Sequence, residues 1–235
     1  MSLSKQPNNG FIIVASKHTK YLQSALMCYD SLLDHYPDAN ITLFVSEELY
    51  NKTSSLLTRY NVVYSGVPED KRAKLWALYN TPYENTVYLD SDTFVVNDEI
   101  QTIWNQQKDN DILITKIRRY NSNPKGYMEN KEFPYIHHGG VFIYSKKAIP
   151  FMKEWWTRWK ETRALEIFKE TYPDIPPKMK EWDQFYLWYL IYKTDHGLKI
   201  DFFEDDARWN FVTGYLKNEL NGKPPIIEHY TIKGL

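Results

Sequence analysis

The stretch Thr86-Val87-Tyr88-Leu89-Asp90-Ser91-Asp92 decides the fold, because it joins an apolar strand directly to two carboxylates. Its first four residues predict a buried β-strand. In open α/β sheets, ligands bind beyond the carboxyl ends of the strands, where Asp90 and Asp92 are expected. Carboxylates two residues apart on a turning backbone can converge on one hard cation. A solvated turn is an equally good interpretation of this motif alone, since Asp and Ser favour turns.

The chain before this stretch alternates between strand and helix patterns. Apolar runs at 11–15 and 41–45 predict buried strands, and a shorter strand is expected at 61–64. Helices are expected at 22–36, 47–60 and about 70–79; in the first, apolar residues recur three and four positions apart. This alternation is typical of a parallel sheet with helical crossovers.

The chain after this stretch predicts further strands at 93–96, 111–117, 139–144, 200–203 and 225–230. Ser145 is expected to cap a helix, and a nearly all-apolar helix is expected at 182–192. The buried face of the first of these helices is expected to comprise Met152, Trp155, Trp156, Trp159 and Phe168. Residues 118–138 predict a long polar loop, which we expect to border the acceptor and to be mobile without ligand.

Length and composition favour one soluble α/β domain. The chain has 235 residues, 29 basic against 30 acidic residues and a net charge of −1, so nothing suggests a nucleic-acid partner. No apolar run approaches the roughly 20 residues of a transmembrane helix, and no signal peptide is expected. The single cysteine, Cys28, suits a reducing compartment, so we expect a cytoplasmic protein. The 16% of aromatic residues suit sugar rings and bases, although packing in the core accounts for most of them.

Two histidine-containing segments are further candidates. His229 ends the apolar strand expected near the C-terminus, and with Asp90 and Asp92 it would suit Mn²⁺ or Mg²⁺. A lone histidine at a strand end is more often packed or exposed than a metal ligand. In His137-His138-Gly139-Gly140, the glycines let the backbone approach a ligand closely, but a bend between loop and strand is the alternative. Neighbouring strand residues point to opposite faces, so at most one of the two histidines reaches a given site.

Carboxylate, amide and cationic side chains complete the candidate set. Asp183 and Gln184 stand at the head of the aromatic helix, where they can bind sugar hydroxyls, although capping is a routine role for Asp. We expect Asp183 to face a ligand, because a carboxylate at a buried helix start must be paired or ligand-facing. Lys71, Arg72 and Lys74 can neutralise phosphate, or form a solvated charged face.

Taken in order, these segments resemble glycosyltransferase family 8, the glycogenin and galactosyltransferase-like group with the GT-A fold. The resemblance spans about residues 11–233. It rests on Lys74-Leu75-Trp76-Ala77-Leu78, Val87-Tyr88-Leu89-Asp90-Ser91-Asp92-Thr93, Gly139-Gly140-Val141-Phe142-Ile143-Tyr144, Trp182-Asp183-Gln184, Trp209-Asn210 and the segment 226–233. It implies a single Rossmann-like α/β domain with a mixed, mostly parallel sheet, in which residues 4–100 form a nucleotide-binding half and residues 101–235 a sugar and acceptor half.

The resemblance also implies roles for individual residues. Asp90, Asp92 and His229 would hold a divalent metal on the donor diphosphate. The donor, expected to be a UDP-sugar, would be bound by Ala15, Ser16, Tyr21, Lys74, Asp90, Ser91, Asp92, His138, Gly139 and Lys233. Asp183 and Gln184 would act in catalysis, with retention of anomeric configuration, on an unknown glycan, lipid or protein acceptor. The sequence departs from the family pattern at His138, where the family has Asn, and at Ile232, where it has Gly.

Three other classes of protein compete with a glycosyltransferase. A sugar nucleotidyltransferase should carry a glycine-rich loop after the first strand, but Ser16-Lys17-His18-Thr19-Lys20 contains no glycine. A metal-dependent phosphohydrolase usually needs more carboxylate and histidine ligands than this sequence assembles. A non-catalytic relative that binds nucleotide sugars or carbohydrates could retain both the fold and the aromatic residues. Turnover of a nucleotide sugar separates that relative from an enzyme.

Overall fold

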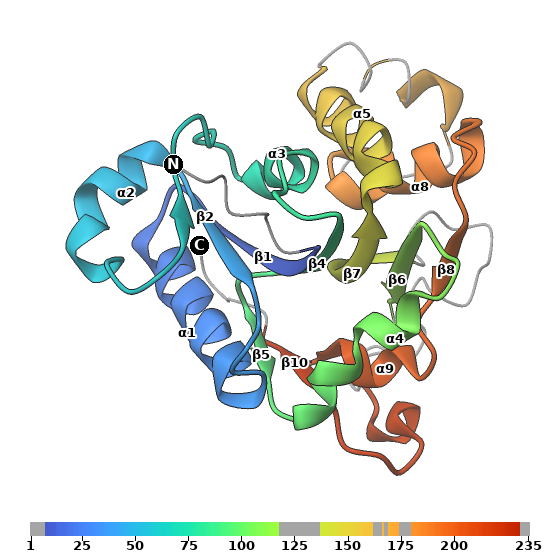
Figure 1. Cartoon of the computed structure of the whole chain (residues 1–235). Coiled ribbons are helices and arrows are strands. Elements are labelled where there is room, and N and C mark those ends of the chain that lie inside the picture. Colours follow the sequence, from blue (N-terminus) through green and yellow to red (C-terminus); the bar gives the residue numbers. More distant parts are fainter. Residues whose placement is uncertain (1–7, 118–136, 162–165, 167–168, 174–179, 231–235) are drawn as a thin grey trace.

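The computed structural model describes residues 8–117, 137–161, 166, 169–173 and 180–230 (Figure 1). Within them a seven-stranded sheet has the order β3-β2-β1-β4-β7-β6-β8. Its strands are β1 (Asn9–Ala15), β2 (Ile41–Val45), β3 (Val62–Val63), β4 (Asn85–Leu89), β6 (Ile112–Lys116), β7 (His137–Ser145) and β8 (Ile200–Phe202). β7 runs antiparallel to β4 and β6, and the other pairs are parallel, which confirms the mixed, mostly parallel sheet.

Helices cover both faces of this sheet, because alternate side chains of each buried strand enter two different cores. Ile12 and Val14 pack with residues of α3, α5 and α8, whereas Phe11 and Ile13 pack with residues of α1 and α2. Figure 1 shows α3, α5 and α8 on one side of the sheet and α1 on the other. The helices are α1 (Thr19–His35), α2 (Glu47–Thr53), α3 (Ala73–Tyr79), α4 (Trp104–Gln107), α5 (Ile149–Lys160), α8 (Asp183–Lys193) and α9 (Asp206–Trp209).

A second, three-stranded sheet brings the end of the described chain back to the centre. Its order is β5-β10-β9, formed by β5 (Thr93–Val95), β10 (Ile227–His229) and β9 (Phe211–Val212). β10 pairs antiparallel with β5, so that His229 stands opposite Thr93. Since β5 follows the turn after β4, this pairing places His229 beside the two aspartates of that turn.

The structure differs from the expectations at several element ends, among them the end of α2, the start of α5 and the start of β7. The helix expected at 47–60 ends at Thr53, and a single 3-10 turn, Ser54–Leu56, follows before the chain folds back to bury Leu57. Ser145 makes no capping hydrogen bond; it precedes a 3-10 turn, Lys146–Ala148, and the N-cap residue of α5 is Ala148, followed by a proline in the first turn. The loop expected to reach 138 ends earlier, since β7 begins at His137, and the rest of that loop lies outside the described residues.

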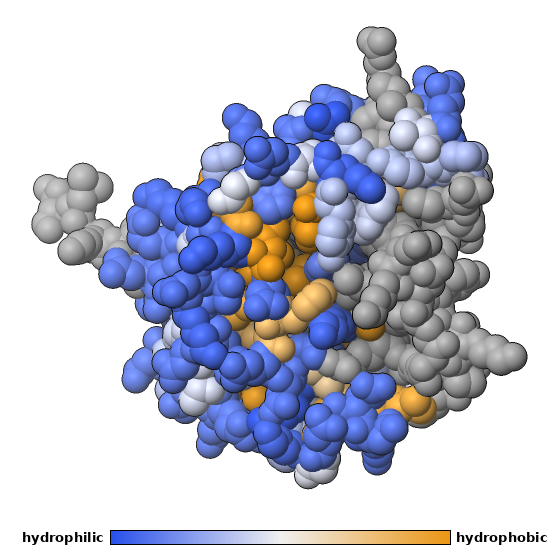
Figure 2. All heavy atoms as spheres, turned by 90° about the vertical axis from the view of Figure 1, so that its right-hand side faces the viewer, coloured by the Kyte–Doolittle hydropathy of each residue, from blue (hydrophilic) through white to orange (hydrophobic). Residues whose placement is uncertain are grey.

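Most large apolar side chains of the described residues pack in the two cores on either side of the sheet. Figure 2 shows a face whose rim is hydrophilic, with hydrophobic residues visible in a hollow near its middle. Among the described helices, none combines the length and the apolar character that crossing a membrane requires.

Candidate active site

The candidate site lies where the strand order of the sheet reverses. β1 pairs with β2 on one side and with β4 on the other, and such a switch point opens a crevice at the carboxyl ends of the strands. β4 delivers Asp90 to this edge. The antiparallel β7 starts at the same edge, and the backbone N–H of Asp90 donates to the carbonyl oxygen of Gly140 at 2.7 Å. Side chains from both ends of the chain therefore meet here.

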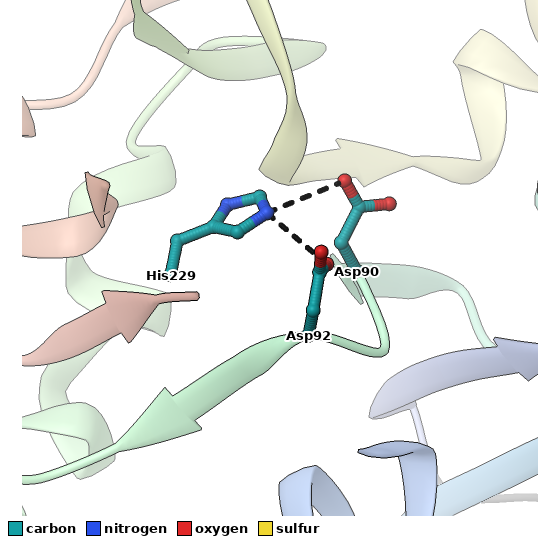
Figure 3. A group of neighbouring side chains, drawn as sticks. All are labelled: Asp90, Asp92 and His229. Carbon is teal, nitrogen blue, oxygen red and sulfur yellow. Dashed lines mark ion pairs between the residues drawn. The ribbon is translucent and has the colours of Figure 1, made fainter. Parts of the chain in front are cut away.

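Asp90, Asp92 and His229 converge on one point (Figure 3). The His229 Nε2 atom lies 3.1 Å from Asp92 Oδ1 and 4.0 Å from Asp90 Oδ2. One ligand atom from each residue lies within 4.8 Å of the others. The Tyr230 N–H donates to the Asp92 carbonyl oxygen at 2.8 Å, which ties the two segments together. Two carboxylates and an imidazole in this arrangement can hold a divalent metal ion.

Asp90 remains ionised in spite of its burial. Burial alone would raise the pKa of its carboxyl group, but Lys74 and His229 outweigh that effect and lower this pKa to about 2. The Tyr88 hydroxyl also donates to Asp90 Oδ1. Asp90 is therefore an anion that already has a cation on one side and an imidazole on the other.

Two cations from the start of α3 pair with Asp183, and one of them, Lys74, also connects it to Asp90. Lys74 Nζ lies 3.2 Å from Asp90 Oδ1 and 3.4 Å from Asp183 Oδ2, and it donates to the Gly139 carbonyl oxygen at 3.0 Å. Arg72 Nε lies 3.0 Å from Asp183 Oδ1. Burial lowers the pKa of Lys74, but the two carboxylates outweigh it, so that the pKa is raised and the ammonium group stays charged. These two cations engage both oxygens of Asp183.

Asp183 does not cap its helix. The N-cap residue of α8 is Trp182, no side chain caps this end, and Asp183 is the first helical residue. Its side chain is 5% exposed and is held by Arg72 and Lys74. Gln184 follows on the same turn and is half-buried. The ion pairs, and not a cap, therefore explain why a buried carboxylate is tolerated at this position.

A cavity of about 190 Å³ opens beside the carboxylates. Ala15 is the last residue of β1, and the hydroxyl of the next residue, Ser16, donates to the Asp70 carbonyl oxygen at 2.8 Å. The cavity is lined by Val14, Ser16, Tyr21, Lys71, Arg72, Ala73, Lys74, Tyr88, Asp90, Ser91 and Asp92. It thus places cations, hydroxyl groups and two aromatic rings around the two aspartates, a suitable set for a phosphorylated ligand.

The two neighbouring histidines of β7 have different surroundings, as the alternation of a strand requires. His137 stacks on Phe202 with ring centroids 5.1 Å apart, and burial lowers its pKa to about 4. His138 points toward the site, where its ring lies 5.1 Å from that of His229. Burial and the nearby His229 lower the pKa of His138 to about 3, so its ring is neutral. The carbonyl oxygen of Gly139 accepts a hydrogen bond from Lys74, which also pairs with Asp183. His138 and Gly139 therefore lie on the Asp183 side of the site.

The sequence gives no role to two residues of this arrangement, Tyr88 and Asn210. Arg72 is a candidate cation from the sequence, but its ion pair with Asp183 is not indicated there. Tyr88 precedes Asp90 by two positions on the strand, and this spacing could have indicated that both side chains share a face. Asn210, which bonds to both His138 and His229, belongs to a motif of the resemblance but had no role assigned. Lys233 lies outside the described residues.

Comparisons with known proteins support the fold. No protein-family model and no curated protein sequence matches this chain. Among solved structures, the galactosyltransferase LgtC in complex with donor and acceptor sugar analogs has a TM-score of 0.56 and 15% identity, over 94% of this chain and 87% of LgtC. The apo glycosyltransferase GlyE of Streptococcus pneumoniae TIGR4 has a TM-score of 0.61 and 14% identity, over 97% of this chain and 55% of GlyE.

A eukaryotic structure shows the same similarity. Mouse xyloside xylosyltransferase 1 in its apo form has a TM-score of 0.56 and 11% identity, over 95% of this chain and 98% of the mouse chain. These similarities extend over nearly the whole of this chain, and they agree with the observed mixed sheet and its flanking helices. The chain therefore has the GT-A fold of the glycosyltransferases that its sequence resembles.

Proposed function

We propose that this chain is a family 8 glycosyltransferase that uses Mn²⁺ or Mg²⁺ to transfer a hexose from a UDP-sugar to a hydroxyl acceptor, with retention of anomeric configuration. The observation that carries the proposal is the convergence of Asp90, Asp92 and His229 beside a cationic cavity at the switch point of the sheet. Residues 4–100 would bind the nucleotide, and residues 101–235 the sugar and the acceptor. The single cysteine favours action in the cytoplasm.

The donor set suits the proposed metal. Hard divalent cations prefer carboxylate oxygens and accept imidazole, and three protein ligands leave positions for phosphate oxygens. Asp90, Asp92 and His229 would hold the ion, which would supply a Lewis acid that stabilises negative charge on a leaving diphosphate. Asp90 is ionised before any metal binds, since Lys74 and His229 lower its pKa to about 2.

Lys74 would also stabilise negative charge on the diphosphate. Lys74 lies between Asp90 and Asp183, and its raised pKa keeps it charged where a diphosphate would develop charge. Preorganised cations at such a position lower the barrier because they need not reorient during the reaction. Ser16, Tyr21 and Ser91 line the same cavity and would contact the nucleotide.

Asp183 would position the donor sugar. Both of its oxygens already face cations, and pairing with cations weakens a carboxylate as a nucleophile. Its ion pairs instead fix the carboxylate beside Arg72 and Lys74, two of the residues that line the cavity, and there it would accept hydrogen bonds from sugar hydroxyls. Gln184, His138 and Gly139 lie near it and would complete the sugar pocket. The acceptor hydroxyl would then attack an anomeric carbon with oxocarbenium character.

The direct test supplies UDP- and GDP-sugars with Mn²⁺ or with EDTA and measures the release of nucleoside diphosphate and the anomeric configuration of the product. The proposal predicts Mn²⁺-dependent release from a UDP-hexose and an α-linked product from an α-linked donor. Tight binding without release would support a non-catalytic relative. Formation of a nucleotide sugar from a nucleoside triphosphate and a sugar phosphate would support a nucleotidyltransferase.

A further inference from the structure

Asn210 connects the proposed metal ligand His229 to the sugar-side residue His138. Its side chain is buried, with 1% of the residue exposed. Asn210 Nδ2 lies 3.0 Å from Thr115 Oγ1 and 2.9 Å from His138 Nδ1, and Asn210 Oδ1 lies 2.9 Å from His229 Nδ1. The amide therefore has partners for both of its N–H groups and for its oxygen.

The backbone N–H of Gly140 fixes which atom donates and which accepts in each hydrogen bond of this network. The Gly140 N–H donates to His138 Nδ1 at 3.1 Å, and a backbone amide can only donate. His138 Nδ1 must then carry a lone pair, so the Asn210 atom facing it must be the NH₂ group. Reversing the amide would put its oxygen against that lone pair. The second N–H of Asn210 reaches Thr115, whose hydroxyl in turn donates to the Val141 carbonyl oxygen at 3.3 Å.

The tautomer of His229 follows from this orientation. With its NH₂ group committed to His138 and Thr115, Asn210 presents its oxygen to His229 Nδ1, and that nitrogen must carry the proton. The lone pair of a neutral His229 ring then lies on Nε2, the atom that faces Asp92 at 3.1 Å. In metal-binding proteins the second nitrogen of a ligating histidine commonly donates to such an oxygen, which fixes the ring and its tautomer.

We propose that Asn210 is the positioning residue of the metal centre, which holds His229 in the Nδ1–H tautomer and aims its Nε2 lone pair at Asp90 and Asp92. This inference rests on the proposed metal-dependent function and deepens it. The position of Asn210 also explains the orientation of His138, because His138 Nδ1 accepts hydrogen bonds from both the Gly140 N–H and the Asn210 NH₂ group. The metal ligand and the sugar-side histidine thereby belong to one hydrogen-bonded unit.

The test measures Mn²⁺ affinity from the electron paramagnetic resonance signal of free Mn²⁺, without any substrate. Asn210→Leu removes the oxygen that accepts from His229 and should weaken Mn²⁺ binding by about 10- to 100-fold. Asn210→Asp keeps an acceptor at the same place but presents no NH₂ group to His138. It should lower the unfolding temperature as Asn210→Leu does, while it keeps Mn²⁺ affinity within a few-fold of the wild type.

A matched control separates the role in metal binding from simple loss of a buried polar side chain. Thr42 of β2 is also buried, with 1% of the residue exposed, and its hydroxyl pairs with the Tyr83 hydroxyl at 2.9 Å and accepts from Asn61 Nδ2 at 3.2 Å. Thr42→Val should reduce stability without changing Mn²⁺ affinity. Equal loss of Mn²⁺ affinity in Asn210→Asp and Asn210→Leu would overturn the proposal, as would unchanged affinity in Asn210→Leu.

A second measurement needs no variant. In the Mg²⁺-loaded wild type, long-range ¹H–¹⁵N correlation spectra should show His229 protonated at Nδ1, and a spectrum with the proton on Nε2 would overturn the proposal even if Asn210→Leu does not fold. Failure of the wild type to bind Mn²⁺ or Mg²⁺ would instead contradict the metal centre itself, and with it the proposed function.

Discussion

Gly140→Ala should disrupt the proposed metal centre, whereas Gly139→Ala should not. A Cβ atom added at Gly140 would lie 2.7 Å from His229 Cε1 and 2.8 Å from both Cε1 and Nδ1 of His138. Neither ring can move away freely, since Asn210 holds His229 at 2.9 Å and His138 at 2.9 Å. At Gly139 the nearest atoms would be Trp155 at 3.6 Å and Lys74 at 3.9 Å, which are ordinary contacts.

The size of each effect follows from these distances. Overpacking of a close-packed region costs about 1–3 kcal/mol, which for a chain of this length corresponds to a fall of about 2–12 °C in unfolding temperature. The displaced His229 ring should also weaken Mn²⁺ binding by about 10- to 100-fold. Gly139→Ala should change stability by less than about 1 kcal/mol, because loss of chain entropy in the unfolded state offsets small strain.

The assay pairs thermal unfolding with Mn²⁺ affinity for the two variants and the wild type. Both substitutions add one methyl group to neighbouring residues of the same strand, so their difference isolates the contact with the histidines. The reasoning would be refuted by a Gly140→Ala protein with wild-type Mn²⁺ affinity, or by a Gly139→Ala protein that loses as much affinity as Gly140→Ala.

Three further predictions concern other charged groups. Asp183→Asn should lower kcat/KM for sugar transfer by about 100-fold or more, and it should also lower the unfolding temperature, because Arg72 and Lys74 lose a buried anionic partner; near-normal transfer would return Asp183 to a structural role. Lys74→Met should weaken binding of UDP with Mn²⁺ by about 10- to 100-fold, the value of a charged hydrogen bond, and unchanged calorimetric affinity would contradict its assigned role. The pKa of Asp111 is lowered, because Lys147 and the Lys199 N–H outweigh burial. The charged Asp111 carboxylate therefore stabilises the fold above the unfolded pKa of about 3.9, and this stabilisation is lost as the pH falls through the lower folded pKa. The unfolding temperature of Asp111→Asn should thus lie below that of the wild type at neutral pH and approach it in acid. A gap between the two unfolding temperatures that grows toward low pH would refute this.

The sheet could be predicted because its strands are short, apolar and separated by clear helical patterns. The runs at 11–15, 41–45 and 86–89 are each buried on both faces. A continuous apolar run of this kind predicts a buried strand from its own residues alone. The direction of β7 was not predictable from its own residues, since a buried antiparallel strand has the same apolar pattern as a parallel one. The end of α2 was missed because tertiary contacts, such as the burial of Leu57, decide it.

Parts of the candidate site could also be inferred, and the reason is the geometry of strand ends. Asp90 and Asp92 follow an apolar strand, and such a position fixes the edge of the sheet at which they lie. Local sequence carries no comparable signal for Arg72 or Asn210. Asn210 is 95 residues from Thr115 and 72 from His138, so only the folded chain shows that its amide completes their hydrogen bonds.

The most direct test of the central claim is calorimetry of UDP binding to the wild type and to Asp92→Ala, each with Mn²⁺ and with EDTA. The wild type should bind UDP far more tightly with Mn²⁺, because Asp90, Asp92 and His229 would hold the ion beside the cationic cavity. Asp92→Ala should remain folded and lose that Mn²⁺-dependent gain. Unchanged Mn²⁺-dependent affinity in Asp92→Ala would contradict the account.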